Sequence, residues 1–232
     1  LALDILPGWA EQLREFLKIF PARVDDYEAL LSRNPVWLER TRGVGVLKLE
    51  DAIALGASGP MLRASGLAHD IRKAEPYSGY DHFQFEVPVG TNGDTYDRYL
   101  VRVNEMRQSH RIITQALDGL PEGDFRTRDW RYALPSREEL KSSMEALIFH
   151  YKFVTDGFEV PAGEVYHPIE SPKGEFGFYI VSDGGTKPWR CRVRPPSFVN
   201  LGCLSRMVEG RLVADLVAAL GSIDIVLGEV DR

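Results

Sequence analysis

Two charged residues near the end of the chain have a type and a setting that suit binding or catalysis. Lys173 lies in the short segment Glu170-Ser-Pro-Lys-Gly-Glu175, between two predicted strands. A loop lysine held between a proline and a glycine could face a cleft. The same pattern also fits an ordinary solvent-exposed lysine. The residues alone leave both interpretations open.

The apolar tail holds the second candidate, because Asp224 lies there between Ile223 and Ile225. A carboxylate in such surroundings reaches a cavity or pairs with a buried base. Alternatively, it caps a helix or forms a structural ion pair. Arg232 is the last residue, so its guanidinium lies close to the terminal carboxylate, although chain ends are often frayed.

A third candidate is a row of arginines, Arg190, Arg192 and Arg194, along one predicted strand. Alternate residues of a strand share one face. That face suits an acidic partner or an anion, and it equally suits plain exposure to solvent.

The motifs that metal binding, nucleotide binding and serine hydrolase chemistry require are missing from the sequence. None of the five histidines has the i, i+4 spacing of a helical metal pair, and Cys191 and Cys203 form no CxxC motif. Gly43-Val-Gly45 lacks the third glycine of a dinucleotide site, and there is no P-loop and no GxSxG motif. The sequence therefore predicts no metal site and no bound nucleotide.

The composition is that of an ordinary globular protein, with 44% hydrophobic and 27% charged residues among 232. The formal net charge of −6 argues against a general nucleic-acid surface. The most apolar stretch, Leu212–Gly228, contains Asp215 and Asp224, so we expect no membrane-spanning helix. The chain does not begin with methionine, and we expect more protein upstream.

Apolar periodicity and turn residues predict mainly helices in the first two thirds. Pro21 is expected to kink or divide the first helix, and Pro35 to follow its end. Asp94 is a good N-cap, and Ser136 with Glu139 forms a capping box. The predicted elements are a helix over 8–33, short helices over 37–40 and 48–55, a strand over 83–87, a helix from 94 to about 119 and a helix from 136 to about 157.

The helix after Ser136 carries an apolar stripe that is expected to be buried: Leu140, Met144, Leu147, Tyr151 and Val154. Three strands then follow, over 164–170, 175–182 and 189–194, with short helices near 198–207 and 211–220. The expected fold class is α+β, mainly helical, with a small antiparallel sheet near 163–194. We expect residues 1–232 to form one unit.

Several long motifs occur in one order along almost the whole chain. They are Leu62-Arg-Ala-Ser-Gly66, Asp70-Ile-Arg-Lys73, Val87-Pro-Val-Gly90, Gly93-Asp-Thr-Tyr-Asp-Arg98, Glu105-Met-Arg-Gln-Ser109, Glu170-Ser-Pro-Lys-Gly-Glu-Phe-Gly177, Arg194-Pro-Pro-Ser-Phe198 and Asp224-Ile-Val-Leu-Gly-Glu-Val-Asp-Arg232. In these motifs the chain resembles the C-terminal part of the D subunit of respiratory complex I, the proton-pumping NADH:quinone oxidoreductase. The N-terminal part of that subunit would be absent.

That family resembles the large subunit of [NiFe] hydrogenases, which holds nickel through cysteines near its C-terminus. The tail here has no cysteine, so a nickel site is not expected. The resemblance implies that the cavity that holds the metal in hydrogenases binds quinone in this family. By motif, Lys173, Asp224 and Val226 lie at or near that quinone cavity, with Arg232 in support, and they tune its electrostatics and shape. The residues that hold the quinone headgroup lie upstream of this chain.

The resemblance also implies partners and a location. The terminal iron–sulfur cluster lies in the neighbouring B subunit, and the C subunit and a membrane-arm subunit are further partners. No NAD, flavin or cluster is expected on these residues, and the fragment alone is expected to be inactive. The location implied is peripheral, on the cytoplasmic side of the inner or plasma membrane. The sequence does not choose between ubiquinone and menaquinone. A scaffold subunit without catalytic residues here, a hydrogenase-type subunit and a relative with another electron donor, such as ferredoxin, are the alternatives.

Overall fold

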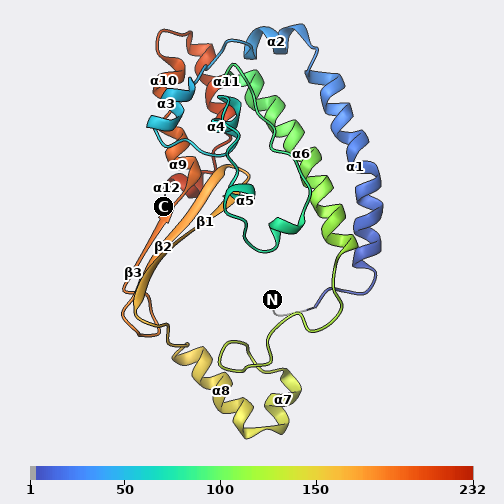
Figure 1. Ribbon diagram of the computed structural model, residues 1–232, viewed down its shortest axis with the longest axis vertical. Coiled ribbons are helices and arrows are strands. Elements are labelled where there is room, and N and C mark those ends of the chain that lie inside the picture. Colours follow the sequence, from blue (N-terminus) through green and yellow to red (C-terminus); the bar gives the residue numbers. More distant parts are fainter. Residues whose placement is uncertain (1–3, 232) are drawn as a thin grey trace. The chain divides into compact units, whose positions relative to one another are not determined.

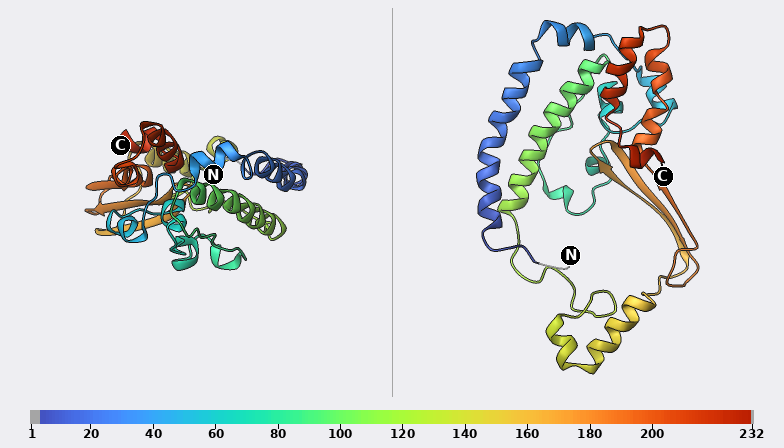
Figure 2. Two further views of the ribbon diagram at one scale, coloured as in Figure 1. Left: turned by 90° about the horizontal axis from the view of Figure 1, so that it is seen from above. Right: turned by 180° about the vertical axis from the view of Figure 1, so that it is seen from behind.

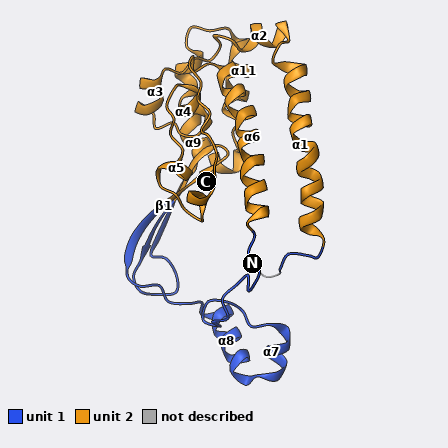
Figure 3. Ribbon diagram, turned by 45° about the vertical axis from the view of Figure 1, so that its right-hand side comes forward, with its two compact units in different colours: residues 1–7, 120–167, 178–192 blue, residues 8–119, 168–177, 193–232 orange. Residues whose placement is uncertain are grey.

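The computed structural model describes residues 4–231 and shows helices with one small sheet (Figure 1). The chain divides into two compact units (Figure 3). The larger unit comprises residues 8–119, 168–177 and 193–232, and the smaller unit comprises residues 1–7, 120–167 and 178–192. The candidate residues Lys173, Asp224 and Val226 all belong to the larger unit.

Two long helices, α1 (Trp9–Leu31) and α6 (Thr95–Asp118), lie side by side in the larger unit (Figures 1 and 2). They run antiparallel, because Arg14 of α1 pairs with Asp118 at the end of α6 at 2.5 Å, whereas Ser32 after α1 bonds Tyr99 near the start of α6 at 3.0 Å. The Asp94 side chain accepts the backbone N–H of residue 97, so the predicted N-cap of α6 is confirmed.

Pro21 was predicted to kink or divide the first helix, and a division is wrong, because α1 continues through this residue. Proline has no N–H for the carbonyl four residues earlier, which is that of Leu17. The Nε2 atom of His110, on α6, lies 2.9 Å from this carbonyl oxygen. A carbonyl only accepts hydrogen bonds, so Nε2 carries the hydrogen and replaces the missing donor.

Short helices connect α1 to α6. They are α2 (Pro35–Thr41), α3 (Leu49–Ala54), α4 (Pro60–Ala64), α5 (Ile71–Ala74) and the 3₁₀ helix η1 (Tyr80–His82). The sequence predicted α2 and α3 but not α4 or α5. The strand expected over 83–87 is not formed. There the backbone N–H groups of Gln84 and Glu86 donate to the side chains of Gln115 and Gln108 on α6, at 2.8 and 3.0 Å. These backbone N–H groups therefore donate to side chains of a helix and not to a neighbouring strand.

The C-terminal part of the larger unit contains α9 (Pro196–Leu201), α10 (Leu204–Val208), α11 (Val213–Ile223) and α12 (Leu227–Asp231). Its side chains complete the buried core, in which Met207 and Ile223 meet Leu47 and Met61. The core thereby fixes the end of α11, and with it the position of Asp224.

A three-stranded antiparallel sheet, with the strand order β1-β2-β3, confirms the predicted fold class. Its strands are β1 (Gly163–Ser171), β2 (Gly174–Ser182) and β3 (Arg190–Arg194). Pro172 and Lys173 form the turn between β1 and β2, as predicted, and this turn belongs to the larger unit.

The smaller unit contains α7 (Arg137–Ser142) and α8 (Met144–Thr155), where one helix was predicted. Ser143 separates them, because its backbone is extended and its side chain caps α8 through the N–H of residue 146. The capping box of Ser136 and Glu139 is confirmed. No helix within residues 4–231 combines the length and the apolar character that crossing a bilayer requires.

The prediction that the stripe on α8 is buried is wrong. Met144 is 73% exposed, and Leu147, Tyr151 and Val154 are exposed too. The opposite side of α8 faces inward, where Phe149 lies against Trp130 with ring centroids 6.2 Å apart. An aromatic ring buries more apolar area than most side chains, so packing favours burial of the side of α8 that carries Phe149.

Candidate functional site

The turn that carries Lys173 is held on both sides by close backbone packing. Gly59, at φ +64°, lies so near the turn that a Cβ there would come within 2.4 Å of the Cα of Gly174. Asn200 donates from its side-chain amide to the carbonyl of Lys173 at 2.9 Å and accepts the N–H of Ser58 at 3.2 Å. The lysine backbone is therefore fixed, and its side chain is mostly buried.

Asp224 follows directly after α11 in the left-handed conformation, with φ +60° and ψ +53°. Its carboxylate forms a close ion pair with the ammonium group of Lys173, although the two residues are 51 positions apart. The Asp224 side chain is 45% exposed, so the pair lies at an opening of the larger unit. The structure thus brings together two residues that the sequence marked separately.

Two arginines one turn apart on α6 hold the end of α11. Arg98 donates from Nε to the hydroxyl of Ser222 at 2.8 Å. Arg102 donates from Nη2 to the carbonyl of Ile223 at 3.2 Å, and its Nε lies 3.7 Å from Oδ2 of Asp224. Cations suit the C-terminal end of a helix, where unpaired carbonyls carry partial negative charge. Burial lowers the pKa of Arg98 to about 9, which still leaves the group charged at neutral pH.

A third arginine, Arg63 on α4, is buried and joins two carboxylates. Its side chain is only 2% exposed. Nε donates to Oε1 of Glu105 at 2.8 Å, and Nη1 donates to Oε1 of Glu170 at 2.7 Å. Arg72 pairs with Asp70, the N-cap of α5, at 2.6 Å. A charge buried this deeply requires such partners, because an unpaired one would be strongly destabilising.

Six of these charged groups line a cavity of about 440 Å³ in the larger unit, whereas Lys173 reaches it only through its partner Asp224. The walls are contributed by α1, α4, α5, η1, α6, β1, the turn after β1 and the residue after α11. The lining residues that matter here are Arg63, Arg72, Arg102, Glu105, Glu170 and Asp224. A second cavity, of about 410 Å³, lies among α2, α6 and α11 and shares Arg102 and Asp224 with the first. The arrangement offers fixed charges of both signs to a ligand in the first cavity.

Val226, which was predicted at or near the quinone cavity, lies two residues after Asp224. Its backbone N–H donates to the hydroxyl of Ser197 at 3.2 Å, while its side chain is 42% exposed and lines neither cavity. Ser197 also donates to the carboxylate of Glu229. The predicted residue Arg232 lies outside the described residues.

The three arginines predicted to share one face of β3 differ in exposure and in their contacts. Arg190 and Arg192 are exposed. Arg194 instead donates to the carbonyls of Glu175 and Gly56, at 2.8 and 2.9 Å, and therefore holds the backbone of the larger unit.

Sequence reasoning missed most of the charged wall. Arg63, Arg72, Arg98, Arg102 and Glu105 were noted only within family motifs or not at all. One signal was available: residues 98, 102 and 105 share a helical face with the apolar residue 101, and charged side chains on a buried face need partners.

Comparison with known proteins identifies the class. The family model described as respiratory-chain NADH dehydrogenase, 49 Kd subunit, matches residues 1–232. The chain belongs to this family, as its motifs predicted.

Individual relatives carry a more specific name. The D 1 subunit of NADH-quinone oxidoreductase from Solibacter usitatus is 54% identical over 232 residues, which is 100% of this chain and 57% of that protein. The D 2 subunit of the same enzyme from Koribacter versatilis is 55% identical over 97% of this chain and 56% of its own length. The D subunit from Wolbachia pipientis is 49% identical over 100% and 60%. The chain therefore spans less than two thirds of the length of these relatives.

Proposed function

We propose that this chain works as part of the D subunit of an NADH:quinone oxidoreductase and forms a wall of the cavity in which quinone is reduced. The observation that supports this most directly is the ion pair of Lys173 and Asp224 at the cavity lined by Arg102 and Glu105. The names of the relatives supply the substrate class, since each is named as the D subunit of an NADH-quinone oxidoreductase.

The ion pair suits quinone chemistry. A quinone carbonyl oxygen gains negative charge as electrons arrive, and a fixed ammonium group beside it stabilises that charge. Lys173 would supply the ammonium group. Asp224 would hold it in place and balance its charge while the cavity is empty. Arg102 positions Asp224 by holding the carbonyl before it.

The remaining parts of the reaction would come from elsewhere. Electrons would reach the quinone from an iron–sulfur cluster in the B subunit, and this chain would bind no NAD, flavin or cluster. The N-terminal part of the D subunit would contribute the residues that hold the quinone headgroup. The C subunit and a membrane-arm subunit would be further neighbours, and the assembly would lie peripherally on the cytoplasmic side of the membrane. The chain alone would be inactive.

Asp224→Ala in the full-length subunit, in native membranes, tests this proposal. We expect quinone reduction by NADH to fall about tenfold or more, which corresponds to a loss of about 1.4 kcal/mol of transition-state stabilisation. Reduction of ferricyanide by NADH should persist, because ferricyanide takes electrons before they reach the quinone. The measurement is the ratio of the two rates at equal amounts of assembled complex.

A matched control is Asp26→Ala, which removes an aspartate from an exposed i, i+3 pair on α1. This variant should keep both rates, since exposed pairs contribute little. Loss of assembled complex in Asp224→Ala would make Asp224 structural. Unchanged rates would remove the ion pair from the quinone site.

A scaffold role is the second candidate, and the apolar stripe on α8 favours it. Met144, Leu147, Tyr151 and Val154 stay exposed in the chain by itself, and a contiguous apolar stripe of this kind is typical of a protein interface. Leu147→Asp should then reduce assembly while leaving the rate per assembled complex unchanged. Blue-native electrophoresis of membranes, with an activity assay on the same samples, measures both.

A further inference from the structure

The carboxylates around the charged cavity differ in how fully they are bound. Asp70 accepts hydrogen bonds from the guanidinium and the backbone N–H of Arg72. Glu170 uses both oxygens, because Oε1 accepts from Arg63 and Oε2 accepts the N–H of Ile71 at 3.2 Å. Asp224 is paired with Lys173 and has Arg102 nearby.

Glu105 is bound on one oxygen only. Nε and Nη2 of Arg63 lie 2.8 and 2.6 Å from Oε1 of Glu105. Within residues 4–231, Oε2 accepts no hydrogen bond. The side chain is 16% exposed and lines the cavity. Glu105 can therefore carry a proton on Oε2 without giving up its contacts with Arg63.

We propose that Glu105 is a proton-holding residue of this cavity and supplies one of the two protons that the bound quinone consumes. The proposal rests on the function proposed above. Conversion of a quinone to a quinol takes two electrons, here from a reduced iron–sulfur donor, and two protons, and it forms two O–H bonds. One of these protons leaves Oε2 of Glu105. The carboxylate that remains is stabilised by Arg63 and takes a new proton from the solvent.

The charges around Glu105 suit repeated loss and gain of a proton. Cations would stabilise the carboxylate once the proton has left, while the neighbouring carboxylates favour its return. The charged and titratable groups around it, from each element that lines the cavity, are Arg63 on α4, Asp70 and Arg72 at α5, Tyr80 on η1, Arg102 on α6, Glu170 on β1 and Asp224 after α11.

Burial supports the same assignment. It raises the pKa of Glu105 above its usual value, although Arg63 acts in the opposite direction. Asp70 differs, because its bonds to Arg72 hold its pKa below the usual value. Between these two buried carboxyl groups, Glu105 is the one that keeps its proton to higher pH.

Two variants of the full-length subunit in the assembled complex test the proposal. Glu105→Gln keeps the shape and an acceptor for Arg63 but has no proton to give. Its rate of quinone reduction should fall about a hundredfold, which lies within the range for a positioned proton donor, while ferricyanide reduction stays unchanged. Glu105→Asp should retain much of the quinone rate, with a shifted pH profile. A carboxylic C=O band that changes on quinone reduction in infrared difference spectra should disappear in Glu105→Gln.

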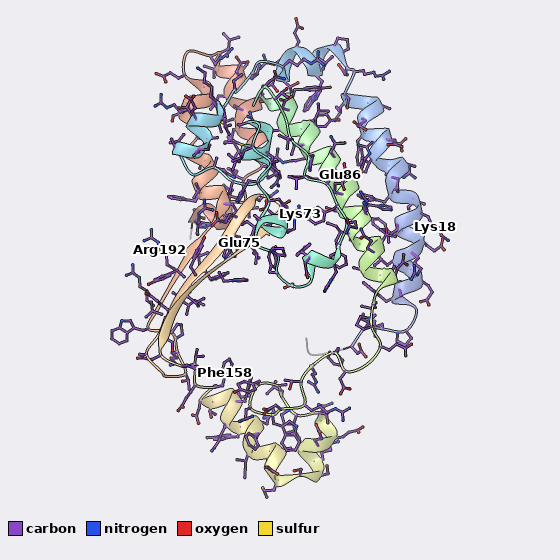
Figure 4. All side chains as sticks on the ribbon, in the orientation of Figure 1. Lys18, Lys73, Glu75, Glu86, Phe158 and Arg192 are labelled. Carbon is purple, nitrogen blue, oxygen red and sulfur yellow. The ribbon has the colours of Figure 1, made fainter. Side chains whose placement is uncertain are left out.

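The control is Glu86→Gln, which removes an 80% exposed carboxylate from the segment between η1 and α6 (Figure 4). It should leave the quinone rate and its pH profile unchanged. A Glu105→Gln enzyme with the normal rate and profile would overturn the proposal. So would loss of assembly in both Glu105 variants, because Glu105 would then only be a structural partner of Arg63.

The Asp224→Ala and Glu105→Gln results together distinguish a failure of the proton-holding role from a failure of the proposed function. If Asp224→Ala loses quinone reduction and Glu105→Gln does not, only the proton-holding role is wrong. If neither variant changes quinone reduction, the cavity itself is not the quinone site.

Discussion

Each unit contains an arginine–carboxylate ion pair of the same length, but the pair in the larger unit is buried and the pair in the smaller unit is exposed to solvent. In the larger unit, Arg63 and Glu105 lie 2.6 Å apart with an arginine side chain that is 2% exposed. In the smaller unit, Arg131 and Asp129 also lie 2.6 Å apart, but the arginine side chain is 66% exposed. Distance alone would rank the two pairs equally. Burial separates them, because removal of water makes a charge dependent on its partner, whereas water replaces a partner at the surface.

Breaking the buried pair should give the largest effect. In Arg63→Met, the buried carboxyl groups of Glu105 and Glu170 lose the guanidinium group that pairs with both of them. We expect the free energy of unfolding to fall by about 3–5 kcal/mol, as for other buried pairs that lose one member. Urea denaturation followed by far-ultraviolet circular dichroism measures it. A loss as small as that at a surface pair would contradict the contrast between the units.

Asp70→Asn should give an intermediate effect that depends on pH. Arg72 holds the pKa of Asp70 below the unfolded value of 3.8, so the ionised group favours folding. Its contribution is fully present above the unfolded pKa and is lost as pH falls through the folded pKa. At pH 7 the variant should be less stable by about 1–3 kcal/mol, the range for a buried hydrogen-bond partner left without its match.

The difference in stability between the wild type and Asp70→Asn should shrink below pH 3.8, the unfolded value. Denaturation midpoints at a series of pH values measure this difference. A difference in stability that stays constant down to the lowest pH would mean that the charge of Asp70 does not stabilise the fold.

Arg131→Met should give the smallest effect. Its pair with Asp129 is solvated, so the unfolding transition should stay within measurement error of the wild type. The same denaturation assay used for Arg63→Met makes the two results directly comparable. A clear destabilisation would show that exposure is a poor guide to the importance of an arginine in this chain.

Local signals explain what the sequence could predict. The caps at Asp94 and Ser136 depend on a few neighbouring residues, and both are present in the structure. The apolar stripe on α8 correctly indicated a helix. It could not tell which side would be buried, because that depends on the aromatic side chains of another segment. The alternation over 83–87 failed for a related reason, since glutamines of α6 take the backbone N–H groups there.

The same limit applies to the site. Lys173 stood out because a proline and a glycine flank it in a tight turn, and Asp224 stood out because it lies in an apolar tail. Arg63, Arg102 and Glu105 lie within helices, where charged residues are common, and only the tertiary structure shows that they are buried together. Pairing between residues 51 positions apart is likewise a property of the fold.

The proline within α1 has a consequence for how the two long helices are aligned. A regular helix presents the same backbone at every turn, so its backbone alone does not fix which turn a neighbouring helix lies against. Pro21 makes one turn different, because the carbonyl of Leu17 has no donor from its own helix. His110 of α6 supplies that donor from 93 positions away. This hydrogen bond therefore favours the register in which His110 lies beside the turn that contains Leu17.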